Sequence, residues 1–87
     1  EFNKTINNKQ NFSPLKIISW NVNGLHSYDK REKIFEYIEK LDCDACYLQE
    51  THSSPSLINT WKKEWHGQSF WNSGETHLTC GVAILFK

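Results

Sequence analysis

Two short apolar runs frame the first part of the chain and predict two β-strands. Residues 15–22 are nearly continuous in apolar side chains, which is typical of a strand covered on both faces. The Asn23-Gly24 pair ends this run, because both residue types tolerate positive φ in a turn. Residues 45–49 form the second run and predict a second short strand.

The segment between these runs predicts an amphipathic α-helix. Asp29 is the expected cap of its first turn, with Glu32 three residues later in the place of a capping-box acid. Arg31 is expected on the charged outer surface. One apolar stripe, flanked by Phe35, recurs at helical spacing and consists of Ile34, Tyr37, Ile38 and Leu41. Strand, helix and strand in this order predict a βαβ unit with two parallel strands.

A second helix and two further strands are expected in the remaining chain. Ser54 is the expected N-cap, and Pro55 stands where a first-turn proline is tolerated. Strands are predicted over 69–71 and 81–86, joined by a polar turn over 72–79. The apolar side of the helix, which Gly67 should stop, is formed by Leu57, Ile58, Trp61 and Trp65. We interpret the tryptophans as core, although such a pair also suits partner binding or base stacking.

The polar residues 1–13 show no apolar period and predict a disordered leader or linker, followed by one domain over 14–87. No apolar run approaches the roughly 20 residues of a membrane span. The formal net charge is +0, so composition supplies no clustered basic face for a nucleic acid. Charge therefore neither predicts nor excludes a local DNA-binding groove.

Candidate metal ligands stand at the ends of the two parallel strands. Ligands gather outside the carboxyl ends of strands in open α/β sheets. Asn21 and Asn23 close the first predicted strand, and Glu50 follows the second. Oxygen ligands of this kind suit Mg²⁺ or Mn²⁺. The alternative is that all three, and His52 beside them, are solvated turn residues.

The three cysteines offer a competing metal site. The sequence Cys43-x-x-Cys46 with His77-x-x-Cys80 has the composition of a Cys₃His zinc site. The strand prediction, however, points Cys46 toward a packed face, where a free cysteine behaves as a small hydrophobe. The odd count and the absence of a visible secretory signal favour a reducing, intracellular setting.

Three ordered motifs resemble the endonuclease/exonuclease/phosphatase superfamily in its apurinic/apyrimidinic-endonuclease branch. They are residues 15–25 (LKIISWNVNGL), 47–52 (YLQETH) and 80–86 (CGVAILF), and with the tryptophan helix they cover nearly everything after Pro14. They look most like the N-terminal part of a non-LTR retrotransposon endonuclease. The resemblance implies an α/β fold, the N-terminal portion of the four-layered α/β sandwich of this superfamily.

The resemblance also implies roles for single residues. Glu50 matches the family's metal-binding carboxylate, and Asn21 matches an asparagine that hydrogen-bonds in the active site and helps hold the scissile phosphate. Asn23 stands near the metal, where DNA-repair relatives carry aspartate. His52 stands at a substrate-binding position where repair enzymes tend to carry lysine, and this exchange resembles retroelement endonucleases.

The implied activity is Mg²⁺- or Mn²⁺-dependent hydrolysis of DNA by a nuclear endonuclease of retroelement type. The family's remaining catalytic motifs have no counterpart in these 87 residues, so we expect the segment to be inactive by itself. Two alternatives stay open: a fragment of a phosphatase relative, and a non-catalytic relic. The relic would bind a protein partner or a second copy through an uncovered sheet face.

Overall fold

The structure is a computed structural model, and it describes residues 14–74 and 80–87. The expected leader over 1–13 lies outside the described residues. The same holds for the 75–79 part of the polar turn, which includes His77. Among the described residues, no helix is long and apolar enough to cross a membrane.

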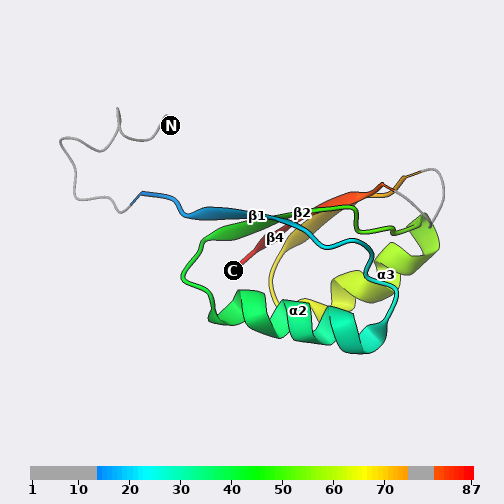
Figure 1. Ribbon diagram of the computed structural model, residues 1–87, viewed down its shortest axis with the longest axis horizontal. Helices are drawn as coiled ribbons and strands as arrows, with labels where there is room; N and C mark the ends of the chain where they lie inside the picture. Colours follow the sequence, from blue (N-terminus) through cyan, green and yellow to red (C-terminus); the bar gives the residue numbers. More distant parts are fainter. Residues whose placement is uncertain (1–13, 75–79) are drawn as a thin grey trace.

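A single four-stranded sheet carries both helices on one side (Figure 1). Its strand order is β1-β2-β4-β3, with β1 parallel to β2 and the other pairs antiparallel. The parallel β1–α2–β2 unit confirms the predicted βαβ arrangement. In chain order the elements are β1 (Ile17–Asn21), α2 (Tyr28–Lys40), β2 (Ala45–Gln49), α3 (Pro55–Glu64), β3 (Ser69–Asn72) and β4 (Val82–Phe86).

The hydrophobic core lies between the sheet and the helices. Side chains alternate between the two faces of a strand, so every second residue faces the helices. Cys46, Leu48 and Leu85 are fully buried there. Trp61 and Trp65 join the same core, which confirms their interpretation as packing residues. From the helices the core also receives Ile34, Phe35 and Ile38.

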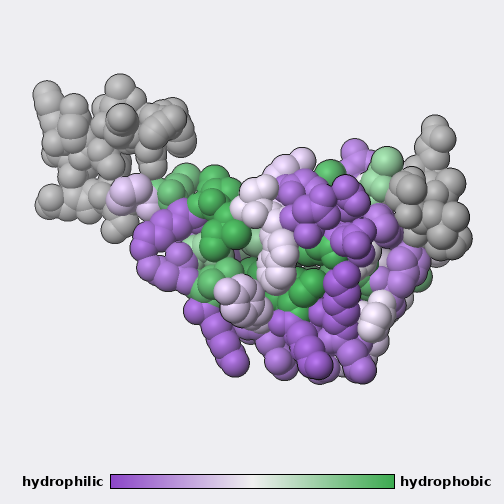
Figure 2. All heavy atoms as spheres, viewed as in Figure 1, coloured by the Kyte–Doolittle hydropathy of each residue, from purple (hydrophilic) through white to green (hydrophobic). Residues whose placement is uncertain are grey.

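The opposite face of the sheet is open, as expected for a segment with an uncovered sheet face. The apolar run of the first strand, which is typical of a strand covered on both faces, is therefore covered on only one face. Ile17 of β1 is 64% exposed, whereas the neighbouring Ile18 packs against the core. Figure 2 shows hydrophobic side chains over β1 and hydrophilic ones along the helical side. The register aligns Tyr47, Ile84 and Phe70 across three strands, and each is exposed. We call Ile17, Tyr47, Phe70, Ile84 and Phe86 the apolar sheet face.

Ser27 caps helix α2, so the prediction of Asp29 as the cap is wrong. The Ser27 hydroxyl accepts a hydrogen bond from Lys30 N, whereas Asp29 lies within the first turn. Ser27 precedes the helix in extended backbone, the conformation that an N-cap residue requires. Tyr37 was also misplaced: it is 55% exposed and meets the Trp20 ring edge-on at the rim of the core.

Arg31 is buried rather than on the outer surface. Its guanidinium pairs with Glu64 of α3 and lies 4.9 Å from the Trp61 ring centroid. It also donates to the Leu25 carbonyl at 2.8 Å. A buried guanidinium needs this number of acceptors, because an unpaired charge in the core is strongly destabilising. Arg31 therefore joins the two helices to the loop that follows β1.

Candidate active site at the ends of two parallel strands

The carboxyl ends of β1 and β2 bring Asn21 and Glu50 together, although they are 29 positions apart in the sequence. Asn21 pairs with Gln49 in the parallel register, so Glu50 emerges beside it. The Asn21 amide donates from Nδ2 to Glu50 Oε2 at 2.9 Å. Its Oδ1 accepts from the backbone N–H of Asn23 at 3.0 Å. Both ends of the Asn21 side chain are thereby used, and they fix its orientation.

Left-handed backbone conformations gather around this pair. Asn23, Glu50, His52 and Cys80 have φ values of 52°, 55°, 57° and 63°. A residue other than glycine adopts such a conformation at a cost of about 1–3 kcal/mol, and such residues cluster at functional sites. Asn23 confirms the predicted turn, whereas the left-handed conformations of Glu50 and His52 have no signal in the sequence pattern.

Four backbone hydrogen bonds tie the three site loops together. After β1, Gly24 N donates to the Glu50 carbonyl at 2.7 Å and Leu25 N to the Thr51 carbonyl at 3.1 Å. On the other side, Thr51 N donates to Gly81 O at 3.0 Å and His52 N to Cys80 O at 2.8 Å. Backbone hydrogen bonds from the loops on both sides therefore hold the turn that carries Glu50 and His52, and they keep it in its strained conformation.

The buried side of this turn is a pair of hydroxyls. Thr51 and Ser53 are fully buried, and their hydroxyl oxygens are 2.9 Å apart. Gly81 has φ +88°, and a Cβ at this position would lie 2.5 Å from Thr51 Oγ1. Glycine is therefore required here both for its conformation and for its size. Sequence reasoning missed this pair, because hydroxyl residues at a strand end read as ordinary loop residues.

His52 lies beside the carboxylate. Its Nε2 is 3.8 Å from Glu50 Oε1, and its side chain is 19% exposed against 50% for Glu50. Gly24 makes room for the ring, since a Cβ there would lie 2.8 Å from His52 Nδ1. The structure thus brings the four predicted site residues to one edge of the sheet: Asn21, Asn23, Glu50 and His52.

The donor set at this edge fits a hard divalent cation. In the described ranges 14–74 and 80–87, no group of three or more His, Cys, Asp or Glu residues converges on one point. Glu50 is half exposed, and the oxygen that does not bind Asn21 faces His52 at a distance longer than a hydrogen bond. Mg²⁺ commonly takes one or two carboxylates and completes its shell with water and substrate phosphate. One carboxylate is therefore a sufficient protein anchor.

The alternative zinc site is not formed by the described residues. Cys46 is fully buried in the core, and burial raises the pKa of its thiol to about 11. A thiol must lose its proton to bind zinc, so this environment opposes coordination. Cys43 is also buried, whereas Cys80 is exposed beside the Glu50–His52 turn, where its carbonyl accepts from His52 N. His77 lies outside the described residues.

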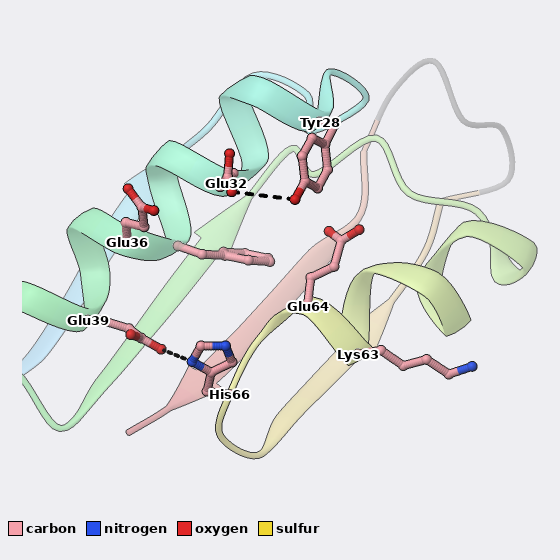
Figure 3. A pocket seen from close by; sticks show the side chains of 8 residues that line it. Tyr28, Glu32, Glu36, Glu39, Lys63, Glu64 and His66 are labelled. Carbon is pink, nitrogen blue, oxygen red and sulfur yellow. Dashed lines mark hydrogen bonds and ion pairs between the residues drawn. The ribbon is translucent and has the colours of Figure 1, made fainter.

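A separate groove of about 300 Å³ lies between α2 and α3 (Figure 3). Two of its contacts are visible there, from Tyr28 to Glu32 and from Glu39 to His66. The negative charge of Glu32 raises the pKa of Tyr28. Its wall is rich in carboxylates: Glu32, Glu36, Glu39 and Glu64. This charge repels phosphate, so the groove is no candidate for binding a nucleic-acid backbone.

Sequence comparisons relate the chain to a transposon protein and to an exodeoxyribonuclease. It is 35% identical over 76 residues to the transposon TX1 uncharacterized 149 kDa protein of Xenopus laevis, covering 84% of this chain and 6% of that protein. It is 30% identical over 73 residues to an exodeoxyribonuclease of Bacillus subtilis, covering 84% of this chain and 28% of that enzyme. No family model matches the chain.

Among solved structures, the crystal structure of the Xenopus laevis APE2 catalytic domain is similar, with a TM-score of 0.62 and 28% identity. The match covers 84% of this chain and 23% of that domain. The segment has the endonuclease/exonuclease/phosphatase fold. The family resemblance and fold class predicted from the three motifs are confirmed. The chain spans less than a third of each of these relatives.

Proposed function

We propose that this endonuclease/exonuclease/phosphatase segment supplies the metal-anchoring part of a DNA phosphodiesterase site, of the kind found in retroelement endonucleases. The observation that carries the proposal is the Asn21–Glu50 hydrogen bond of 2.9 Å at the carboxyl ends of two parallel strands. The nuclease and transposon names of the relatives support DNA as the substrate over the phosphatase alternative. The nuclear location that the resemblance implies stays a prediction.

Each site residue has a proposed task. Glu50 anchors Mg²⁺ or Mn²⁺ through its carboxylate, and Asn23, which is exposed in the turn after β1, contributes its amide. Asn21 keeps the Glu50 carboxylate in place with one hydrogen of its amide and presents the second to the scissile phosphate. His52 stands beside the carboxylate, where it can donate a hydrogen bond to a phosphate oxygen. The bound metal would supply Lewis-acid neutralisation of the charge that develops during hydrolysis.

We further propose that these 87 residues do not hydrolyse DNA without additional groups. Within the described part of the chain, the site holds one carboxylate and one histidine near each other. General acid–base participation typically contributes about 10²–10⁴-fold, and residues of one catalytic unit lose more than additively when part of the unit is missing. The segment is therefore proposed to bind the metal while lacking the groups that activate water.

Metal binding and plasmid nicking test the two parts of this proposal separately. Mn²⁺ binding to the purified chain is measured by electron paramagnetic resonance, with Glu50→Gln as the site variant and Glu39→Gln as a matched control on helix α2. The proposal expects binding that only Glu50→Gln removes. Supercoiled plasmid is then incubated with Mg²⁺ or with EDTA. Equal Mn²⁺ affinity in all three proteins would refute the proposal that Glu50 anchors the metal. Nicking that depends on Glu50 would refute the proposal that the segment is inactive by itself.

A second candidate function is supported by the apolar sheet face. Its five exposed side chains form a continuous apolar surface of a kind that marks interaction sites. A non-catalytic module would bind a partner, or a second copy of the chain, through this face. Sedimentation of the chain and of Ile84→Lys tests self-association. If the wild-type chain is a monomer at all concentrations, self-association through this face is refuted. Dimerisation that Ile84→Lys abolishes would support it.

A further inference from the structure

We propose that His26 is a positioning residue for the turn that carries Glu50 and His52. This inference rests on the proposed function, because it concerns how the metal anchor is held. The His26 ring nitrogen Nε2 lies 2.8 Å from the backbone carbonyl oxygen of His52. A carbonyl can only accept, so the hydrogen bond requires the proton on Nε2.

The bond acts on a strained part of the backbone. His52 has φ 57°, and its N–H is already bound to the Cys80 carbonyl at 2.8 Å. The His52 carbonyl belongs to the peptide group between His52 and Ser53. The bond from His26 therefore restrains the ψ angle of His52. With both peptide planes held, the His52 ring stays beside Glu50, where Nε2 and Oε1 are 3.8 Å apart.

His26 is itself held by groups from the helical layer. Its ring meets buried Trp61 edge-on, with centroids 5.6 Å apart and planes at 89°. Its backbone carbonyl accepts from Arg31 Nη1 at 3.3 Å, and the same nitrogen donates to Leu25 O. Arg31, which is fixed by its ion pair with Glu64, therefore holds the loop that contains His26. His26 restrains the turn of Glu50 and His52 through its own contact with the His52 carbonyl.

Two variants and a matched control separate positioning from general stability. His26→Ala removes the donor, whereas His26→Gln retains an amide donor of similar reach. His66→Ala deletes another exposed histidine, which pairs with Glu39 in the helical groove. The first readout is amide hydrogen exchange of His52 in the metal-free chain. The second is Mn²⁺ affinity measured by electron paramagnetic resonance.

Loss of one hydrogen bond should raise His52 exchange and weaken Mn²⁺ binding by about 3- to 10-fold in His26→Ala. His26→Gln should recover most of both effects, and His66→Ala should change neither. Unchanged His52 exchange in His26→Ala, or faster exchange in all strands equally, would overturn the positioning role. Because exchange is read without metal, a wild-type chain that binds no Mn²⁺ would refute the proposed function while leaving the positioning role to be decided by exchange alone.

Discussion

The Asn21 side chain connects two loops that the sequence holds 29 residues apart. It donates to Glu50 Oε2 at 2.9 Å while its Oδ1 accepts from Asn23 N at 3.0 Å. One amide thus orients a carboxylate and stabilises the turn that follows its own strand. A strand-end asparagine that does only the second is an ordinary turn residue. The bond to Glu50 is what makes this edge of the sheet a candidate site.

Asn21→Ala should weaken Mn²⁺ binding by several-fold, because the Glu50 carboxylate loses a donor worth about 1 kcal/mol or more. Asn72→Ala is the matched control, since Asn72 is an exposed asparagine on β3, the outer strand on the other side of the sheet. Electron paramagnetic resonance titration measures both variants. Equal affinities for the two variants would show that the Asn21–Glu50 contact does not shape the site.

Gly81→Ala should destabilise the chain by about 2–4 kcal/mol, since a side chain there is strained in conformation and overlaps a neighbour. The overlapping atom is Thr51 Oγ1, at 2.5 Å from the added Cβ. Thr51→Ala removes that atom, so the double variant should be more stable than the sum of the single effects predicts. Urea denaturation followed by circular dichroism gives all four free energies of unfolding. Strict additivity would mean that the steric contact is relieved in another way.

Arg31→Met should cost more free energy of unfolding than an ordinary surface substitution, about 2–4 kcal/mol. The Arg31 side chain is 6% exposed and binds Glu64, which is 27% exposed. Removing one member of a largely buried pair leaves the other charge without its partner. The double variant Arg31→Met/Glu64→Gln should recover part of the loss, as urea denaturation can measure. A loss below 0.5 kcal/mol in the single variant, roughly the size of a surface effect, would contradict a stabilising role of the Arg31–Glu64 ion pair.

The stability of the chain should fall in alkaline solution partly because of Cys46. Burial raises the pKa of its thiol from 9.0 to about 11, so the folded state keeps a proton that the unfolded state releases first. This contribution is fully present below pH 9 and is lost as the pH rises toward 11. Its size is on the order of 2 kcal/mol. Cys46→Ala should show a shallower fall than wild type between pH 8 and 10.5; equal slopes would contradict this prediction.

Ser27 and Ser54 offer a paired test of helix capping. The Ser27 hydroxyl accepts from Lys30 N, whereas Ser54 makes no side-chain cap hydrogen bond. Ser27→Ala should therefore cost about 1 kcal/mol and Ser54→Ala a few tenths. Thermal unfolding of the two variants measures the difference. The reverse order would show that the local geometry of these caps does not govern helix stability.

The sequence patterns predicted most of the secondary structure because they depend on local and topological rules. Residues 45–49 were predicted as a strand and form β2 with the same bounds. The crossover rule also predicts that Asn21 and Glu50 lie at one edge of the sheet, without any knowledge of side-chain contacts. The same reasoning misplaced Arg31, because a charged residue on a helical wheel reads as solvent-exposed. Its burial depends on Glu64, which reaches it from another helix.

The sequence by itself determined the order of the elements, the parallel pairing of β1 and β2, and the family resemblance. These follow from apolar periodicity, turn chemistry and the handedness of the βαβ crossover, which act over short segments or through general rules. Only the tertiary structure decided that β4 lies between β2 and β3, and that Gly81 and Cys80 bind the Glu50–His52 turn. Both features are made by backbone N–H and C=O groups, which every residue other than proline has. Which of these groups pair depends on how distant segments pack together, so a local sequence pattern does not predict it.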